Sequence, residues 1–131
     1  MSGDGELVVV LKDEASAFEP GDEVRGVAGW RLAVPPQSAS VRLIWFTKGK
    51  GTQDVQVVAR EELEGPLGAE EGRKFRFVLP EGPYSFSGKL VSLVWAVELV
   101  VQPGDRGERA EIVVGPGGRE VLLYRGDGGS A

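Results

Sequence analysis

The sequence predicts an all-β domain: a sandwich of two antiparallel sheets with about seven or eight strands and little or no helix. The 20 glycines and 8 prolines fall mostly in clusters, and the segments between them are rich in valine, leucine, isoleucine, phenylalanine and tryptophan. No ten-residue segment carries apolar side chains at a sustained three-four spacing, which argues against helices. A chain of 131 residues can also bury a core that needs no covalent staples.

The first expected strand is residues 6–12, and a tight turn follows at residues 18–22. Pro20 fixes φ in that turn, and Gly21 is free to take a positive φ. The next expected strand, residues 23–33, contains two glycines, which indicate a bulge or a close approach of another backbone. It alternates, so that one face carries Val24, Gly26, Ala28, Trp30 and Leu32.

A third expected strand, residues 40–47, has two different faces. One face carries Val41, Leu43 and Trp45, and the other carries Arg42, Ile44 and Phe46. The glycine-rich residues 48–51 form a hairpin connection to a fourth strand at residues 54–60. Residues 61–72 contain five glutamates together with glycine and proline, and we expect a solvated loop or an irregular edge there.

Four more strands complete the prediction. Residues 73–79 alternate cleanly, whereas residues 90–102 are apolar at almost every position, as in a strand that is either central with both faces covered or paired along its whole length. Residues 103–107 form a turn, after which we expect strands at residues 108–114 and 120–125. Residues 1–125 therefore form a single domain, and residues 126–131 a flexible C-terminal tail.

The alternating patterns also predict the core, although a slip of one residue would invert a strand. The expected core residues are Leu7, Val9, Val24, Ala28, Trp30, Val41, Leu43, Trp45, Phe75, Phe77, Leu79, Val91, Leu93, Trp95, Val97 and Ile112.

Composition excludes several kinds of chemistry. Without cysteine there is no disulfide, thiol nucleophile or thiolate metal site, and without histidine the usual general base and the commonest metal ligand are missing. A formal charge of −5 argues against a broad nucleic-acid-binding surface. The N-terminus lacks the features of a signal sequence, and residues 90–101 are too short for a membrane span. We expect a cytoplasmic protein that is not an enzyme and that holds no cofactor or metal.

Three ordered features resemble an arrestin-type β-sandwich domain. They are Phe18-x-Pro-Gly-Asp-x-Val-x-Gly26, then Leu43-x-Trp45 before a glycine-punctuated hairpin, and then Phe75-x-Phe-x-Leu-Pro80 before Tyr84-Ser-Phe-Ser-Gly88 and a long strand. The resemblance covers roughly residues 6–125. It implies an immunoglobulin-like, Greek-key sandwich with a scaffold or adaptor role and no catalysis.

The resemblance has limits that the sequence itself sets. Classical arrestins place two such domains side by side and sense receptor phosphate through a charged cluster between them. This chain has a single such domain, so that mechanism and its residues are not transferred. Single-domain or divergent bacterial relatives, such as sporulation-control proteins, are nearer in character.

Few residues are candidates for a site. Lys48 and Lys50 form the only basic tip on an acidic domain, and they could contact an acidic partner or a lipid headgroup. A nucleotide-binding loop would need a helix after the glycines, and a strand is expected there instead. Trp30, Trp45 and Trp95 share faces with apolar residues and are interpreted as core.

Other motifs are given plainer interpretations. The glutamates of residues 61–72 could perform glycoside chemistry only if two of them faced each other in a cleft, and we interpret the run as solvated. The tripeptide Arg125-Gly126-Asp127 resembles a cell-adhesion motif and is taken as chance, because no secretion signal accompanies it.

The sequence thus predicts a non-catalytic, cytoplasmic protein-interaction module that binds a protein through a sheet edge or end loops. A homo-oligomer paired through an edge strand, such as residues 120–125, is a second possibility, and contact with a membrane surface stays open. We expect no nucleic-acid partner and no transmembrane segment. The alternative function is a module that binds a small ligand or a carbohydrate, and it would need at least two exposed tryptophans.

Overall fold

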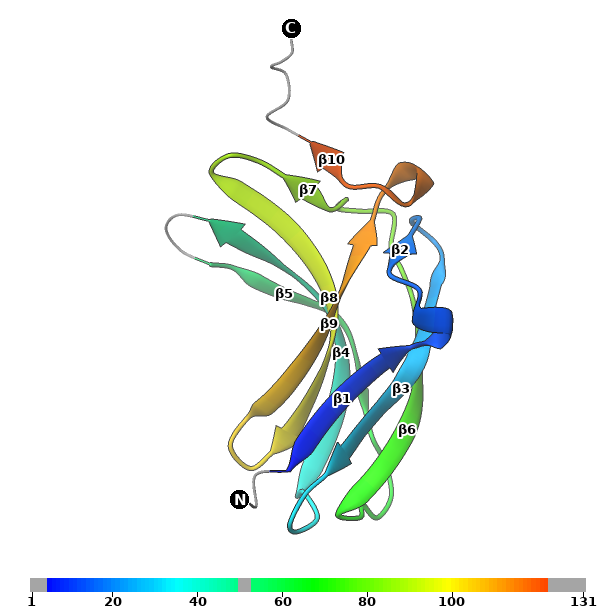
Figure 1. Cartoon of the computed structure of the whole chain (residues 1–131), viewed down its shortest axis with the longest axis vertical. Helices are drawn as coiled ribbons and strands as arrows, with labels where there is room; N and C mark the ends of the chain where they lie inside the picture. Colours follow the sequence, from blue (N-terminus) through cyan, green and yellow to red (C-terminus); the bar gives the residue numbers. More distant parts are fainter. Residues whose placement is uncertain (1–4, 50–52, 123–131) are drawn as a thin grey trace, which may run out of the picture.

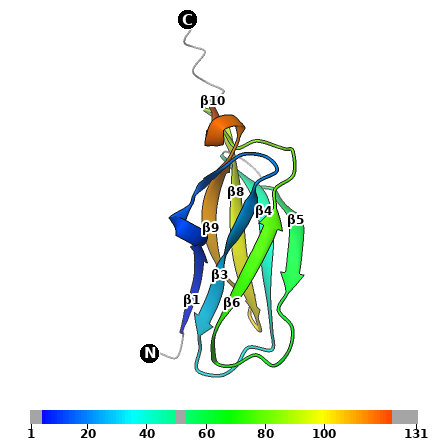
Figure 2. The same cartoon turned by 90° about the vertical axis from the view of Figure 1, so that its right-hand side faces the viewer.

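The computed structural model describes residues 5–49 and 53–122 as two facing β-sheets, shown in Figure 1 and edge-on in Figure 2. The small sheet is antiparallel and has the order β1-β3-β6. Its strands are β1 (Glu6–Leu11), β3 (Glu23–Arg31) and β6 (Glu70–Val78).

The large sheet has seven strands and is built around the pair β4 and β8. Its main path runs β10-β7-β8-β4-β5, and β9 pairs with both β8 and β2. The strands are β2 (Ala17–Phe18), β4 (Ser38–Gly49), β5 (Val55–Glu62), β7 (Phe86–Ser87), β8 (Val91–Gln102), β9 (Arg106–Val114) and β10 (Val121–Leu122). Only two short 3₁₀ turns, η1 (Lys12–Glu14) and η2 (Pro116–Gly118), interrupt this pattern in the described residues. The predicted all-β, two-sheet sandwich is confirmed.

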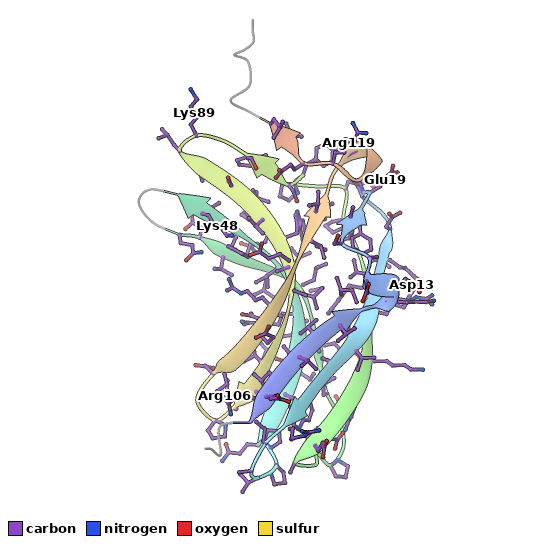
Figure 3. All side chains as sticks on the ribbon, viewed as in Figure 1. Asp13, Glu19, Lys48, Lys89, Arg106 and Arg119 are labelled. Carbon is purple, nitrogen blue, oxygen red and sulfur yellow. The ribbon has the colours of Figure 1, made fainter. Side chains whose placement is uncertain are left out.

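The space between the sheets is filled by apolar side chains from both inner faces (Figure 3). Nearly every predicted core residue contributes to this cluster, with Leu7, Val9 and Trp45 partly buried against it. Val91 is the exception, at 39% exposure. It is the first residue of β8 and pairs with Gly49, which has no side chain to cover it. The predicted core position of Val91 is therefore wrong.

The turn before β3 has the predicted geometry. Gly21 takes a φ of +89°, and the Asp22 N–H donates to the Glu19 carbonyl oxygen at 3.1 Å across Pro20 and Gly21. The Gly21 N–H also donates to the Leu79 carbonyl oxygen at 3.0 Å, so the turn is tied to the end of β6. The turn thus helps to set the register in which β3 pairs with β6.

Residues 61–72 match the predicted loop or irregular edge only in part: residues 63–69 lie between strands, whereas the residues on either side of them are in strands. β5 continues to Glu62, because β4 begins at Ser38 and supplies ladder partners for two more residues. β6 already begins at Glu70, opposite Arg31. Of the predicted last strand, Val121 and Leu122 are in β10, and residues 123–125 lie outside the described residues, as does the tail at 126–131.

Candidate interaction surface

The outer face of the large sheet, which points away from the small sheet, carries the most distinctive chemistry of the molecule. β8 is bowed, with both ends leaning away from the small sheet (Figure 1), so this face is concave. β4 and β8 are paired along their full length, from Ser38 opposite Gln102 to Gly49 opposite Val91. A continuous ladder of backbone pairs therefore fixes the positions from which the side chains on this face project.

A charged network crosses the middle of the outer face. Arg42, Glu98 and Arg109 lie directly opposite one another on β4, β8 and β9. Arg42 donates from Nε to Glu98 Oε1 at 3.1 Å and also from Nη2, and Arg109 donates from Nε to Glu98 Oε2 at 2.9 Å. Glu98 is only 7% exposed, and a buried carboxylate requires such partners because desolvation is costly.

A small apolar cluster lies on one side of this network. Ile44, Phe46 and Ala96 are buried there, with Val94 packed against them. The Arg109 guanidinium carbon lies 4.5 Å from the centre of the Phe46 ring, a cation–π distance. The alternation along β4 predicted Ile44 and Phe46 on this face, but not that the face carries a core of its own.

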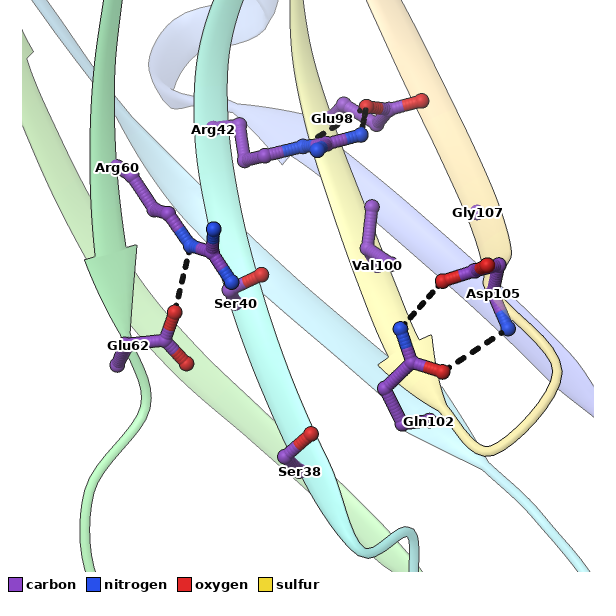
Figure 4. A pocket seen from close by; sticks show the side chains of 10 residues that line it. All are labelled: Ser38, Ser40, Arg42, Arg60, Glu62, Glu98, Val100, Gln102, Asp105 and Gly107. Atoms are coloured by element: carbon purple, nitrogen blue, oxygen red, sulfur yellow. Dashed lines mark hydrogen bonds and ion pairs between the residues drawn. The ribbon is translucent and has the colours of Figure 1, made fainter. Parts of the chain in front are cut away.

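A polar groove of about 430 Å³ lies on the other side of the network (Figure 4). Two features of it matter for binding: a buried hydroxyl, Ser40, and a pair of arginines, Arg42 and Arg60, that face each other across β4 and β5. The groove is lined by Ser38, Ser40, Arg42, Arg60, Glu62, Glu98, Val100, Gln102, Asp105 and Gly107.

β5 is the end strand of the main path of the large sheet and borders this groove. The Leu63 N–H donates to Ala39 O at 2.9 Å, and the Thr47 N–H donates to Asp54 O at 3.0 Å. Because hydrogen-bonded and non-hydrogen-bonded pairs alternate in an antiparallel ladder, the N–H and C=O groups that point to the free edge can be assigned. They belong to Val55, Val57, Arg60 and Glu62.

A β-bulge shifts the register within β5. Leu43 pairs with Ala59, whereas Ile44 pairs with Val57, so Val58 has no partner in the ladder. Because of the bulge, the residues whose backbone groups point to the free edge have their side chains on the outer face of the sheet in both halves of β5. Val55, Val57 and Val58 are all exposed.

Lys48 lies at the end of β4 on the outer side of the large sheet (Figure 3). Its ammonium group is 3.3 Å from Glu111 Oε2 and 5.8 Å from the centre of the Phe46 ring. Lys48 therefore borders the outer face and pairs with a neighbouring carboxylate, and its contact with a partner stays a prediction. Lys50 lies outside the described residues.

The tryptophans do not form an aromatic platform. Trp30 and Trp95 are buried, and their indole N–H groups donate at 2.8 Å to the carbonyl oxygens of Gly68 and Pro83. Trp45 is half-buried against the same core. The interpretation as core is confirmed, and the exposed pair that a carbohydrate platform would need is absent, since all three lie in described segments.

Three of the five glutamates of residues 61–72 pair with arginines, one on β5 and two on β6. Glu62 lies 2.5 Å from Arg60, Glu70 lies 3.1 Å from Arg31, and Glu71 lies 2.7 Å from Arg73.

Two carboxyl groups of the small sheet have a pKa below the ordinary value of glutamate. The Arg73 side chain and the Gly68 N–H lower the pKa of Glu71 by hydrogen bonding to its carboxylate. Hydrogen bonds from Arg76 and Arg25 lower the pKa of Glu23 in the same way. Both groups are stabilised in their charged form, as in structural ion pairs.

Residues 5–49 and 53–122 contain no cluster of three or more acidic side chains placed to hold a metal ion. Among the same residues, no helix is long and apolar enough to cross a membrane.

Comparison with solved structures establishes the type of sandwich. The chain is similar to Spo0M, the sporulation control protein of Bacillus subtilis, with a TM-score of 0.61 and 20% identity over 88% of this chain. That overlap covers 51% of Spo0M, so the chain spans about half the length of this protein. The predicted resemblance is confirmed at the level of the fold, which is an arrestin-like β-sandwich.

Other similarities are weaker. The alkylpurine DNA glycosylase AlkC of Pseudomonas fluorescens, bound to DNA with an abasic-site analogue, has a TM-score of 0.46 and 13% identity, over 88% of this chain and 32% of AlkC. A β-glucosidase of Listeria innocua has a TM-score of 0.41 and 14% identity, over 91% of this chain and 17% of the enzyme. No family model and no curated protein matches the sequence.

Proposed function

We propose that this domain is a non-catalytic, cytoplasmic protein-interaction module of adaptor type, which binds an extended segment of a partner protein along β5. The observation that carries the proposal is the free edge of β5, an eight-residue strand with three exposed valines. At the other end of the strand, Arg60 and Glu62 line the polar groove. An unpaired edge is a template for strand addition, in which backbone hydrogen bonds provide affinity and alternate side chains provide specificity.

The apolar half of this edge lacks the devices that usually protect edge strands. Lysine, proline or an inward-pointing charge normally discourages pairing with another chain. From Val55 to Ala59, β5 carries none of these. By contrast, β6 at the edge of the small sheet carries Arg73, Lys74 and Arg76. β5 is therefore a better candidate for strand addition than β6.

Affinity capture from a lysate of the source organism tests this proposal. Val57→Lys places a charge on the free edge, whereas Val78→Lys makes the same change at an exposed valine of the small sheet. We expect specific proteins to be retained by the wild type and by Val78→Lys, and to be lost with Val57→Lys. Lys48→Glu shows whether the neighbouring basic side chain takes part.

Equal retention by wild type and Val57→Lys would contradict binding along β5. Retention lost equally in both lysine variants would point to a general charge effect. Circular dichroism of each variant controls for folding.

The alternative, a module for a small polar ligand, is supported by the groove itself, whose lining offers both donors and acceptors. It would bind in the groove without using the β5 backbone. Ligand binding that survives Val57→Lys would favour this alternative.

A further inference from the structure

The apolar half of β5, at the edge of the large sheet (Figure 2), contains a segment that is complementary to itself. Val55 and Val57 direct their backbone groups to the free edge, whereas those of Gln56 point to β4. The two valines are 48% and 38% exposed on the outer face. Gln56 is exposed between them, with its side chain on the opposite face. The segment therefore has the same pattern of backbone groups and side chains in either direction.

A second copy of the chain fits this segment about a two-fold axis through Gln56. Antiparallel pairing then places Val55 of one chain opposite Val57 of the other, on both sides of the axis. Both members of each pair have N–H and C=O groups that point to the free edge, so each pair exchanges two hydrogen bonds as in a regular ladder. Such a contact is isologous and closes at two chains.

The same pairing extends the small apolar cluster of the outer face. Val57 is opposite Ile44 on β4, and Val55 is opposite Phe46. Ile44 and Phe46 are buried members of that cluster. In the paired chains the two valines of each pair lie roughly 5 Å apart on one face, a distance at which β-branched side chains stabilise a ladder. The pairing therefore covers valines that are exposed in the single chain.

Other registers of β5 against itself fit less well. An axis through Arg60 or Glu61 sets a charge opposite itself, which is destabilising. An axis at the bulge places Val57 opposite Arg60, an apolar side chain against a charged one. An axis through either valine leaves the other valine opposite a residue outside the segment. The register centred on Gln56 pairs valine with valine and lies wholly on one side of the bulge.

We propose that the protein forms a two-fold symmetric dimer in which the β5 strands of two copies pair antiparallel about Gln56, so that the two large sheets become one. This inference goes beyond the proposed function and does not need it, because the occupant of the edge is a second copy. Pairing also covers an edge that has no lysine, proline or inward-pointing charge to protect it from Val55 to Ala59. The contact is short, so the dimer is reversible, and a partner strand competes with the second copy for the edge.

The first test uses the absence of cysteine from the sequence. Gln56→Cys introduces a single thiol, which in the dimer faces its own copy across a non-hydrogen-bonded pair with Cα atoms about 4.5 Å apart. That separation is within the range of a disulfide. In Val55→Cys the two thiols are offset along the strands, with Cα atoms roughly 8 Å apart, which is too far. Val78→Cys, at an exposed position of the small sheet, measures cross-linking by random collision.

With oxidised glutathione, we expect Gln56→Cys to form a covalent dimer about tenfold faster than either control, because pairing raises the effective concentration of the facing thiols. Non-reducing gel electrophoresis over time measures the three rates. Equal rates in the three variants would overturn the register.

Sedimentation equilibrium tests the dimer without a cross-link. Val57→Lys should raise the dissociation constant of the dimer about tenfold, whereas the matched Val78→Lys should leave it unchanged. A mixture of the Val57→Lys and Val55→Glu variants should restore association, because the new charges lie opposite each other in this register. A mixture of Val57→Lys and Val57→Glu, whose charges are not opposite, should restore it less.

The remaining outcomes separate the dimer from the proposed function. A wild type that stays monomeric at millimolar concentration would overturn the dimer, and capture of partner proteins that is lost with Val57→Lys would still support strand addition. A dimer that Val57→Lys does not weaken would overturn pairing through β5. A dimer that Val57→Lys dissociates, with capture that it does not affect, would support the dimer and contradict the proposed function.

Discussion

Replacing Glu98 by glutamine removes the negative charge that holds two arginines on the outer face. The side chain keeps its size, so the change isolates the charge. Arg42 and Arg109 then face each other across β8 with no neutralising anion. Their side chains are 28% and 35% exposed, so part of each charge is already hydrated.

The expected magnitude follows from this partial burial. Breaking a fully buried ion pair costs about 3–5 kcal/mol, and we expect about 2–3 kcal/mol here because water reaches both arginines. For 131 residues the entropy of unfolding is roughly 0.27 kcal/mol per kelvin, so the melting temperature should fall by roughly 7–11 °C. Glu98→Gln should therefore be one of the most damaging single charge removals in the molecule.

Urea denaturation followed by tryptophan fluorescence measures this cost, because Trp95 lies on the same strand as Glu98. Glu70→Gln is the matched control: its partner Arg31 is 3.1 Å away, but both side chains are about two-thirds exposed. Such a surface pair is worth about 0–1 kcal/mol. If the two variants lose the same stability, the Glu98 network is an ordinary surface feature and the reasoning fails.

Three further predictions concern other parts of the fold. Gly21→Val should lower the free energy of unfolding by about 1–3 kcal/mol, because φ is +89° there although the space around it is open; an unchanged melting temperature would contradict the turn. Ser40→Ala should raise the free energy of unfolding by about 1 kcal/mol, since it removes a buried hydroxyl that has no hydrogen-bond partner among the described residues, and a melting temperature below that of the wild type would show that Ser40 has a partner such as water in the groove. Glu71→Gln should destabilise at pH 7 but progressively less below pH 4.5, the ordinary pKa of this group, because the folded-state pKa of Glu71 is lowered; denaturation at several pH values would reveal a constant difference if this is wrong.

The alternation of apolar residues was sufficient to predict the sandwich and most of its core. Val24, Leu43 and Trp95 are buried as predicted because period-two patterns specify which face of a strand points inward. Val91 failed because a pattern within one strand does not show that its neighbour across the ladder is Gly49. Burial at strand ends depends on which strands extend furthest, and that is a property of pairing.

The outer face was predictable in part. The composition of β8, apolar at almost every position, indicated a strand that is either covered on both faces or paired along its whole length, and β8 is paired with β4 along its whole length. On the outer face, Ala96 of β8 packs with Ile44 and Phe46 of β4 in the small apolar cluster. Glu98 within the same run was the available signal for a buried ion pair, because a buried carboxylate needs cationic partners. The identity of those partners required the register, which brings Arg42 and Arg109 together from positions 67 residues apart.

The groove and the free edge also depend on each other. A ligand side chain gains most from donors that are already fixed, since ordering them on binding costs affinity. Glu98 holds the Arg42 side chain against β8 at the wall of the groove, whereas the described contact of Arg60, which also lines the groove, is to Glu62 on its own strand. The bulge at Val58 then aligns the outward backbone groups of β5 with the side chains that face the groove. Because the backbone and side-chain donors converge on one segment, this edge can distinguish added strands by their side-chain chemistry as well as by their shape. An adaptor of the proposed kind requires such discrimination to select among partners.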